Sequence, residues 1–590
     1  MLRRGFRPER LVRAPVAQSS NPRHLWRQPL RLWLQPLRTS HALAPSRPTV
    51  RGAASLAPSR GSLGAPGLGN DDGGASSTAT GDDTIYALST GRGRAGIAAI
   101  RISGPSCLDV YRALCPAKAL PRPRYAAVRT LFEPQPAAHE PVMLDSQALV
   151  LYFPAPRTVT GQDVLELHVH GGPATVKAVL AAIARSRSSH SMIRYAEPGE
   201  FTKRAFIHGR LDLGQIEALG DTLAAETEQQ RRAAVRGSSG ALGRTYETWR
   251  QQLLLARGEI EALIDFSEDQ HFDESPSHLL ANVARQVADM LHALGLHELA
   301  GQRSELLRNG IRIALLGPPN VGKSSLMNLV VGREASIVSG EAGTTRDIVE
   351  ASLDVRGYLC AFADTAGFRS TGQGAAIGSV EAEGIRRARR KAQDSDVVVA
   401  LASVETGPQG PFIHYDLETL DLAAEADARL VVVNKRDGVD DATLTALLTG
   451  FRETLCRRSP SLADTVPVAI SCHQGRSPAA DGSADPGGIQ SVVDSLAAAF
   501  SRMTDMPAHL QDLLGVTERQ RQLLARCRDH LEAFMAEAGP DEDGIEPDVV
   551  LAAEYLRYAA DCLARMTGRG EGGDVEEVLG VVFEKFCVGK

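Results

Sequence analysis

The chain has 590 residues, of which 43% are hydrophobic, and a formal net charge of −6 at pH 7. This length has room for three or four domains with ordinary hydrophobic cores. The eight cysteines are scattered without CxxC or CxxH spacing, which argues against a disulfide framework and a cysteine-rich zinc site and favours a reducing compartment. No apolar run approaches the length of a membrane span, so we expect a soluble protein.

Residues 1–75 differ in composition from the rest of the chain. The first seventy contain twelve arginines, no lysine and a single acidic residue, Glu9, among many serines, prolines and alanines. This composition is typical of a mitochondrial transit peptide, which is removed after import. The alternative is a disordered basic tail that touches RNA. Loss of residues 1–70 removes eleven net positive charges and leaves a mature chain with a charge of about −17.

The acidity of the mature chain bears on nucleic-acid binding. A protein that holds RNA by itself usually presents a basic surface, because phosphate neutralisation supplies much of the affinity. If the substrate is RNA, we therefore expect a partner to supply much of the contact. One local basic cluster, for which a solvated helix face is the favoured interpretation, comprises Arg386, Arg387, Arg389, Arg390 and Lys391.

The rest of the chain divides into three kinds of segment. Residues 82–212 alternate short β-like runs, such as Val164–Val169, with turns, which predicts a separate α+β domain. Residues 213–305 and 505–590 carry apolar residues at helical spacing. They flank an α/β segment at 308–502. Two helical halves around this segment predict one helical domain that carries an inserted domain.

A phosphate-binding loop opens the α/β segment. Residues 317–324 read Gly-Pro-Pro-Asn-Val-Gly-Lys-Ser between a strand-like run and a helix-forming run. Backbone N–H groups of such a loop surround a phosphate chain, Lys323 reaches the β- and γ-phosphates, and the Ser324 hydroxyl binds magnesium. The other nucleotide-binding residues expected here are Asn320, Val321, Gly322 and Ser325.

Two further motifs concern the γ-phosphate and the magnesium ion. In the stretch that reads Asp364, Thr365, Ala366 and Gly367, the aspartate suits magnesium binding through water and the glycine N–H suits the γ-phosphate. Before it, within Gly343-Thr344-Thr345-Arg346-Asp347, Thr345 is the candidate second magnesium hydroxyl, ordered when the γ-phosphate is present.

The last two motifs concern the base. In the stretch that reads Asn434, Lys435, Arg436 and Asp437, the carboxylate of Asp437 matches the N1–H and 2-amino group of guanine, which adenine lacks. The pair Ser471 and Cys472 stands where a backbone N–H contacts the guanine O6. Because all these motifs follow in order, most of them directly after strand-like runs, they predict a GTPase.

Several short segments outside the G domain are also distinctive: Asp83–Ile85, Gly96 with Arg101–Gly104, Gly161–Leu167, His170–Pro173, Pro198–Phe201, Arg204–Phe206, Leu211–Leu213 and the terminal Phe586–Lys590. With the nucleotide motifs, they resemble the MnmE (TrmE) family of tRNA-modification GTPases, in a mitochondrial form, over residues 83–590. The resemblance implies an N-terminal α+β domain of the folate-binding type, an all-α helical domain, and an α/β P-loop G domain inserted in the helical domain.

The resemblance implies that the N-terminal domain dimerises and binds a reduced folate, 5-formyl- or methylene-tetrahydrofolate, as a one-carbon donor. The matching positions are Arg101, Glu166 and Arg210, with the terminal Lys590 closing on the site. A carboxylate such as Glu166 suits the adjacent donors of a pterin ring; without the family, an outward polar residue on an alternating strand is an equal alternative. Arg210 replaces the family's usual lysine. Cys587 has an implied role in modification, either as a nucleophile or as a packed small residue.

For the G domain, the resemblance implies activation by a potassium ion and by G-domain dimerisation. A cation held against the phosphates stabilises the charge that develops in the transition state. Phe368 stands where other GTPases place a water-orienting glutamine. The family's general base is a later glutamate, which aligns with Glu381, and Glu383 is an alternative. The potassium ligands are expected to be Asn320, Ser339, Glu341 and Thr344.

By resemblance, the protein helps to install a carboxymethylaminomethyl or taurinomethyl group on C5 of the wobble uridine of mitochondrial tRNAs, in the matrix. The implied partner is a flavoprotein of the MnmG (GidA) family, which carries FAD. A ribosome-assembly GTPase of the Era or Der type is one alternative, but it predicts an RNA-binding module and a basic surface that the sequence does not show. A stand-alone folate enzyme with a regulatory G domain is another, and it would modify tRNA without a partner.

Overall fold

A computed structural model describes residues 83–134, 140–186, 188, 191–266, 276–331, 335–337, 352–362, 386, 389–476, 485–538 and 548–569. Within these residues, the N-terminal domain contains a six-stranded sheet in the order β3-β4-β5-β2-β1-β6. Neighbouring strands are antiparallel, except that β1 and β6 are parallel. The strands are β1 (Thr84–Leu88), β2 (Ile97–Ser103), β3 (Ala127–Phe132), β4 (Met143–Phe153), β5 (Val164–His170) and β6 (Ile193–Tyr195).

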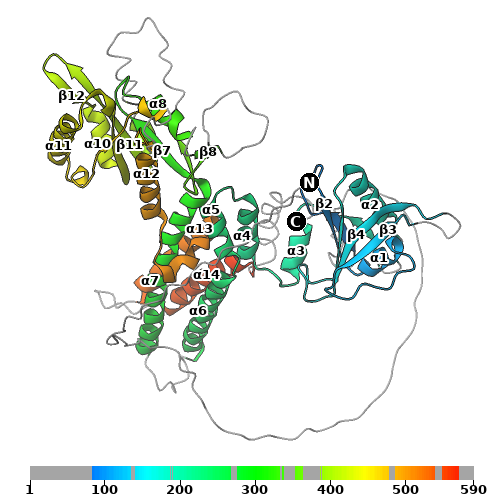
Figure 1. The fold of residues 1–590 in the computed structure, drawn as a ribbon. Coiled ribbons are helices and arrows are strands. Elements are labelled where there is room, and N and C mark those ends of the chain that lie inside the picture. Colours follow the sequence, from blue (N-terminus) through cyan, green and yellow to red (C-terminus); the bar gives the residue numbers. More distant parts are fainter. Residues whose placement is uncertain are drawn as a thin grey trace, which may run out of the picture. The chain divides into compact units, whose positions relative to one another are not determined.

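The two faces of this sheet differ, because side chains alternate along each strand. The odd-numbered residues of β5, from Leu165 to Val169, are buried in a core shared with the helices α1 (Cys107–Leu114) and α2 (Pro173–Arg185). These helices lie on the same side of the sheet (Figure 1). The even-numbered residues, from Glu166 to His170, are less buried and lie on the opposite face. This second face therefore holds the polar side chains that the sequence singled out.

The helical region begins where α3 (Glu200–Ile207) leads into α4. Asp212 and Gln215 form a capping box at the start of α4, and Thr227 and Gln230 form another at the start of α5, which fixes where both helices begin. The helices are α4 (Leu213–Ala224), α5 (Glu228–Gly237), α6 (Ala241–Phe266), α7 (Pro276–Asn309), η6 (Ala508–Gly515), α13 (Glu518–Ala538) and α14 (Val549–Thr567).

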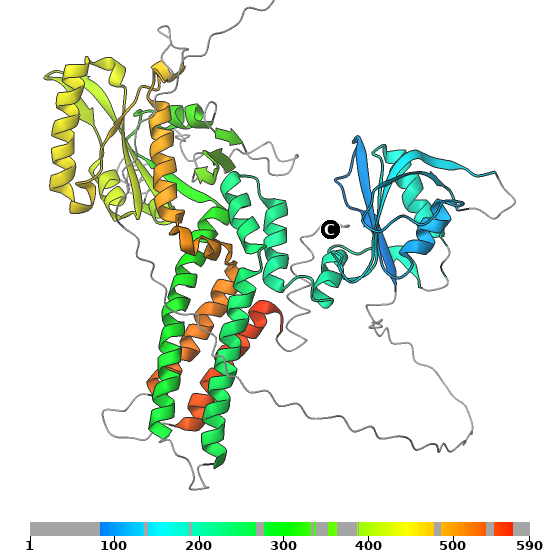
Figure 2. The ribbon, with the colours of Figure 1, turned by 60° about the horizontal axis from the view of Figure 1, so that its bottom comes forward.

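Helices from before and after the G domain share one hydrophobic core. Tyr246 of α6, Leu294 of α7, Leu531 of α13 and Leu556 of α14 are all fully buried in it. Figure 2 shows these four helices side by side as a bundle. The expected multidomain fold, with the G domain inserted into one helical domain, is therefore confirmed. None of the helices that the structure describes combines the length and apolar character needed to cross a membrane.

The G domain is built on an eight-stranded sheet in the part of the chain that the structure describes, in the order β14-β13-β11-β7-β10-β9-β8, with β12 paired to β11. The strands are β7 (Ile311–Leu316), β8 (Ala335–Ile337), β9 (Ser352–Val355), β10 (Tyr358–Phe362), β11 (Val397–Gly407), β12 (Gly410–His414), β13 (Ala428–Asn434) and β14 (Val468–Ala469). The helices are α8 (Lys323–Leu329), α10 (Leu417–Glu425), η3 (Arg436–Gly438), α11 (Asp441–Arg458), η4 (Pro460–Leu462), η5 (Gln474–Arg476) and α12 (Ile489–Thr504).

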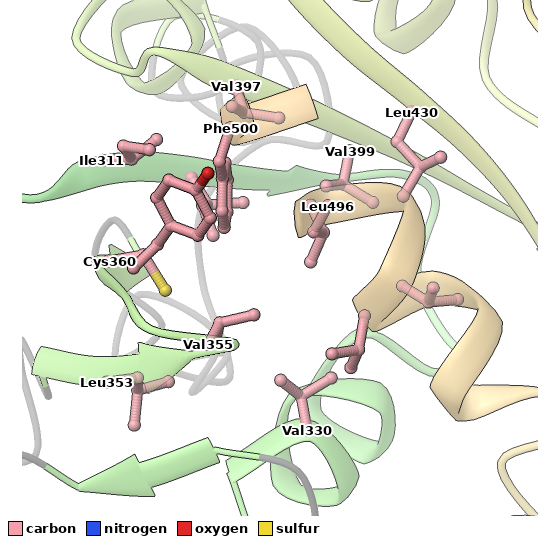
Figure 3. Close-up of a cluster of buried hydrophobic side chains, with 14 of the residues drawn as sticks. Ile311, Val330, Leu353, Val355, Cys360, Val397, Val399, Leu430, Leu496 and Phe500 are labelled. Carbon is pink, nitrogen blue, oxygen red and sulfur yellow. The ribbon is translucent and has the colours of Figure 1, made fainter. Parts of the chain in front are cut away.

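The packing and the strand directions of the G-domain sheet show where a ligand binds. Val397 and Val399 of β11 pack with Leu496 and Phe500 of α12 on one face of the sheet (Figure 3). Strands β10, β7, β11, β13 and β14 run parallel, so their carboxyl ends meet at one edge. In open α/β sheets, ligands bind in the crevice at that edge.

Candidate functional site

The phosphate-binding loop runs from the end of β7 to the start of α8, as the sequence predicts. Gly317 has a φ of +147°, and a Cβ built there would lie 2.2 Å from the carbonyl oxygen of Leu401. Gly322 has a φ of +105°, and its Cβ would lie 2.2 Å from the side-chain nitrogen of Asn434. Glycine is required at both positions, because another residue would be strained and would collide with a neighbour. The loop is thus held close to the neighbouring strand ends.

Lys323 points back into this loop. Its Nζ donates hydrogen bonds of 2.6 Å to the carbonyl oxygens of Gly317 and Pro318. Burial, with a smaller contribution from Lys391, lowers the pKa of Lys323 to about 8. An anion placed in the loop would favour the charged ammonium form. The position therefore suits a phosphate ligand.

Asn434 links the phosphate-binding loop to the segment that contains Ser471 and Cys472, which we call the base-binding loop. Its side chain is buried, its Nδ2 donates to the carbonyl oxygen of Val321 at 2.7 Å, and its Oδ1 accepts from the backbone N–H of Cys472 at 3.0 Å. Three predicted binding segments that are far apart in the sequence thus meet through one side chain. Because the N–H of Cys472 is already bonded to Asn434, its contact with guanine O6 stays a prediction.

Lys435 is fixed at its backbone and at the tip of its side chain. It adopts a left-handed conformation with a φ of +65°, and its Nζ donates to Oε1 of Glu405 at 3.0 Å. The same oxygen accepts from the buried Ser403 hydroxyl at 3.0 Å. The hydrogen bond from Lys435 is the largest influence that lowers the pKa of Glu405. Ser403 is level with Asn434, and β11 continues beyond it to Gly407, so Glu405, two residues after Ser403, lies next to the base-binding motif.

Two other predicted residues have neighbours that the sequence did not indicate. Asp437, the predicted guanine-recognising carboxylate, lies 3.9 Å from Nδ1 of the exposed His473. The hydroxyl of Ser325 accepts a hydrogen bond of 3.0 Å from Arg476 of η5. Asn320 lies in the phosphate-binding loop with a φ of +63°, Ser324 lies in the first turn of α8, and Ser471 is buried. The following residues predicted for the nucleotide site fall outside the described residues: Ser339, Glu341, Thr344, Thr345, Asp364, Thr365, Ala366, Gly367, Glu381 and the alternative Glu383.

The second predicted site lies on the polar face of the N-terminal sheet. Arg101 on β2 is directly opposite Glu166 on β5, and Nε and Nη2 of Arg101 each lie 3.0 Å from Oε1 of Glu166. The other carboxylate oxygen lies 3.5 Å from Nε2 of His168. The sheet register thus brings together two of the predicted folate residues and adds a histidine that sequence reasoning missed.

Arg210 is anchored from a different element. Its Nε donates to the carbonyl oxygen of Thr158, in the loop between β4 and β5, at 2.9 Å. Arg210 itself is an exposed residue. Lys590 and Cys587, the two predicted residues at the carboxyl terminus, lie outside the described residues.

A buried carboxylate on the same sheet was also missed. Asp145 has a side chain only 1% exposed, and its oxygens accept from the backbone N–H and the Nδ1 of His170, at 2.8 and 3.0 Å. These hydrogen bonds fix the end of β5 against β4. The segment His170–Pro173 was noted in the sequence for its resemblance, but nothing in the local pattern pairs it with an aspartate 25 residues earlier.

Comparisons with known proteins agree with this architecture. The family model described as GTP-binding protein TrmE N-terminus matches residues 84–210, and the MnmE helical domain model matches residues 213–587. The human mitochondrial 5-taurinomethyluridine-[tRNA] synthase subunit GTPB3 is 36% identical over 514 residues, covering 86% of this chain and 93% of its own length.

Bacterial and yeast relatives match over a similar extent. The tRNA modification GTPase MnmE of Parvibaculum lavamentivorans is 39% identical over 512 residues, covering 86% of this chain and 100% of its own. The mitochondrial tRNA modification GTPase MSS1 of Saccharomyces cerevisiae is 34% identical over 523 residues, covering 86% and 93%. In each case the match includes most of both proteins.

Proposed function

This chain is a GTPase of the MnmE (TrmE) family of tRNA-modification proteins, and we propose that it helps to modify C5 of the wobble uridine of mitochondrial tRNAs. The observation that carries the proposal is the hydrogen-bonded link through Asn434 between the phosphate-binding loop and the base-binding loop. The chain matches nearly the whole length of relatives that are named as tRNA-modification proteins. The group that is added is carboxymethylaminomethyl or taurinomethyl; the relative named as a taurinomethyluridine synthase subunit supports the second.

The residues of the G domain fit a guanine nucleotide. Gly317 and Gly322 add no side chain of their own to the loop, and the ammonium group of Lys323, which is bonded to the carbonyl oxygens of Gly317 and Pro318, would serve as a counter-charge to a phosphate. Magnesium would be held by the hydroxyls of Ser324 and Thr345, and potassium by Asn320 with Ser339, Glu341 and Thr344. These cations neutralise charge on the phosphates. We assign the general base to Glu381.

The polar face of the N-terminal sheet fits a reduced folate in its donor set. The carboxylate of Glu166 lies between the cation of Arg101 and the imidazole of His168, so a pterin ring binds there only by sharing or displacing these contacts. A bound reduced folate supplies the one-carbon unit. Arg210 would hold an anionic part of the ligand, and Lys590 would close the site. Cys587 would act in the modification itself.

The remaining parts of the proposal concern partners and location. The arginine-rich composition of residues 1–75 and the mitochondrial labels of two relatives support import into the mitochondrial matrix. We propose that the protein acts as a homodimer together with a flavoprotein of the MnmG (GidA) family that carries FAD. GTP hydrolysis would drive movement of the G domains, which the helical domain transmits to the folate site.

Nucleoside mass spectrometry of mitochondrial tRNA tests this function. Cells that lack the protein should lose the C5 modification of wobble uridine, and expression of the wild-type chain should restore it. Expression of a Lys323→Ala chain should not, because the phosphate-binding loop then lacks its cation. Unchanged wobble uridines in the deletion strain, with altered ribosomal subunit profiles, would refute the proposal in favour of a role in ribosome assembly.

A further inference from the structure

Charge is unevenly distributed along the chain. Residues 83–212 contain sixteen lysines and arginines and ten acidic residues, which gives a net charge of +6. Residues 213–590 contain 37 lysines and arginines and 57 acidic residues, which gives a net charge of −20. The N-terminal domain is therefore basic although the whole chain has a negative net charge. A strongly acidic region repels a polyanion, so a nucleic acid that approaches this protein is directed to residues 83–212.

Four exposed arginines of this domain lie on three neighbouring connections. We name Arg122, Arg124, Arg157 and Arg210 the basic strip; the first two lie between α1 and β3, the third between β4 and β5, and the fourth between α3 and α4. Nη2 of Arg124 donates to the carbonyl oxygen of Arg157 at 2.5 Å. Nε of Arg210 donates to the carbonyl oxygen of Thr158, the next residue. These contacts place residues from three connections next to one another.

The backbone around the basic strip is well anchored. Arg124 has a φ of +63°, a conformation that is unfavourable for a residue with a side chain, and its N–H donates to the carbonyl oxygen of Tyr152 at 2.8 Å. The guanidinium of Arg122 lies 4.1 Å from the centre of the ring of Tyr125, whose side chain is 55% exposed. The basic strip therefore combines planar cations with an exposed aromatic ring.

The arginines of the basic strip are not neutralised by the protein. None of the four forms an ion pair with a carboxylate of the described residues, unlike Arg101, which pairs with Glu166. The acidic residue of the β4–β5 loop, Asp163, uses its two oxygens to accept from the hydroxyl of Tyr152 and from the N–H of Ala155, at 2.7 and 2.8 Å. The strip thus retains most of its positive charge for a partner.

We propose that Arg122, Arg124 and Arg157 of the basic strip bind the phosphate backbone of an RNA and bring it beside Arg210, one of the proposed folate residues. Guanidinium groups match phosphate oxygens with paired N–H donors, and an exposed tyrosine provides a surface on which an unpaired base stacks. An acidic protein or an anionic membrane would also meet the charge; we commit to RNA because the exposed ring of Tyr125 beside Arg122 offers a stacking surface for an unpaired base. The inference rests on the proposed function, and it adds a contact from this chain to those expected from a partner.

The test measures the affinity of the full-length chain for an unmodified mitochondrial tRNA transcript over a series of salt concentrations. The test variant is Arg122→Gln with Arg157→Gln, which spares Arg124 with its unfavourable backbone and the proposed folate residue Arg210. We expect about tenfold weaker binding at low salt and a salt slope smaller by about 1.5, since each lost phosphate contact lowers the slope by about 0.7–0.9. The lysine pair Arg122→Lys with Arg157→Lys should restore most of the slope.

A matched control changes the same charge elsewhere. Arg452→Gln with Arg457→Gln alters two exposed arginines of α11, in the acidic part of the chain, and should change tRNA affinity less than twofold. All variants should hydrolyse GTP at the wild-type rate. An unchanged salt slope in the strip variant would overturn the inference, and loss of binding to the flavoprotein or to anionic vesicles instead would assign the strip to that partner.

The two proposals fail separately. If the strip variant loses tRNA binding while deletion of the protein leaves wobble uridines unchanged, the basic strip stands and the modification role falls. If the deletion abolishes modification and the strip variant binds tRNA with the wild-type slope, the modification role stands and the basic strip falls.

Discussion

Glu405 offers a sharp test of how the guanine site is assembled, because it holds Lys435 of the base-binding motif without being part of any motif. Both side chains are partly exposed, at 36% and 40%, and their ion pair spans 3.0 Å. Such pairs contribute about 0.2–1 kcal/mol, which corresponds to a factor of about 1.5–5 in an equilibrium constant. Glu405→Ala should therefore weaken the binding of GDP and GTP alike by up to about fivefold, and leave kcat nearly unchanged.

The assay is titration of the protein with a fluorescent GDP analogue, combined with a double-mutant cycle. Lys435→Ala alone should weaken binding more than Glu405→Ala, because it also removes the lysine from the base. The double variant should bind as Lys435→Ala does. Glu425→Ala, at the end of α10, removes a similar exposed acid that makes no described ion pair and serves as the control. Additive losses in the double variant would refute the view that Glu405 acts through Lys435.

Two further predictions concern the other domains. Burial lowers the pKa of His297 to about 4, so the folded helical domain favours the neutral imidazole. The free energy of unfolding is therefore highest above the ordinary histidine pKa of about 6.5, and it falls by about 3 kcal/mol as the pH drops toward 4. Thermal unfolding at pH 7 and pH 4.5 should show this loss. The variant His297→Gln should flatten the pH dependence; glutamine keeps a polar partner for the hydroxyl of Tyr246, which lies 3.1 Å from Nδ1 of His297. An equal pH dependence in the variant would contradict the assignment. In the N-terminal domain, Glu166→Gln removes the carboxylate that pairs with Arg101 and should weaken the binding of 5-formyl-tetrahydrofolate about tenfold in calorimetry. GTP hydrolysis should stay at the wild-type rate, and unchanged folate affinity would place the folate elsewhere.

Much of the fold could be predicted because its signals are local. The apolar run before the phosphate-binding loop forms β7, and the alternation from Val164 to Val169 forms most of β5. Capping residues, glycines and helical spacing act over a few residues, so they are visible without knowledge of the rest of the chain. The motifs from Asn320 to Ser325 and from Asn434 to Asp437 are of the same kind.

The candidate site could be predicted only in part. Glu166 and Arg101 lie 65 residues apart, and only the antiparallel register of β2 and β5 makes them neighbours. Glu405 carries no motif, and its contact with Lys435 arises because β11 extends beyond the end of its neighbour β13. Such pairings are long-range, and no pattern along the chain encodes them.

The sequence by itself determined the nucleotide chemistry and the order of the domains, because a phosphate-binding loop and a guanine-binding motif depend on backbone conformations that neighbouring residues impose. Only the tertiary structure decided how charge is displayed. The sequence shows an acidic mature chain, yet folding brings together the connections that carry Arg124, Arg157 and Arg210, and it engages the carboxylate of Asp163 with Tyr152 and Ala155. Electrostatic attraction acts through space over about 10 Å at ordinary salt, so it follows from where the charges lie and not from their sum.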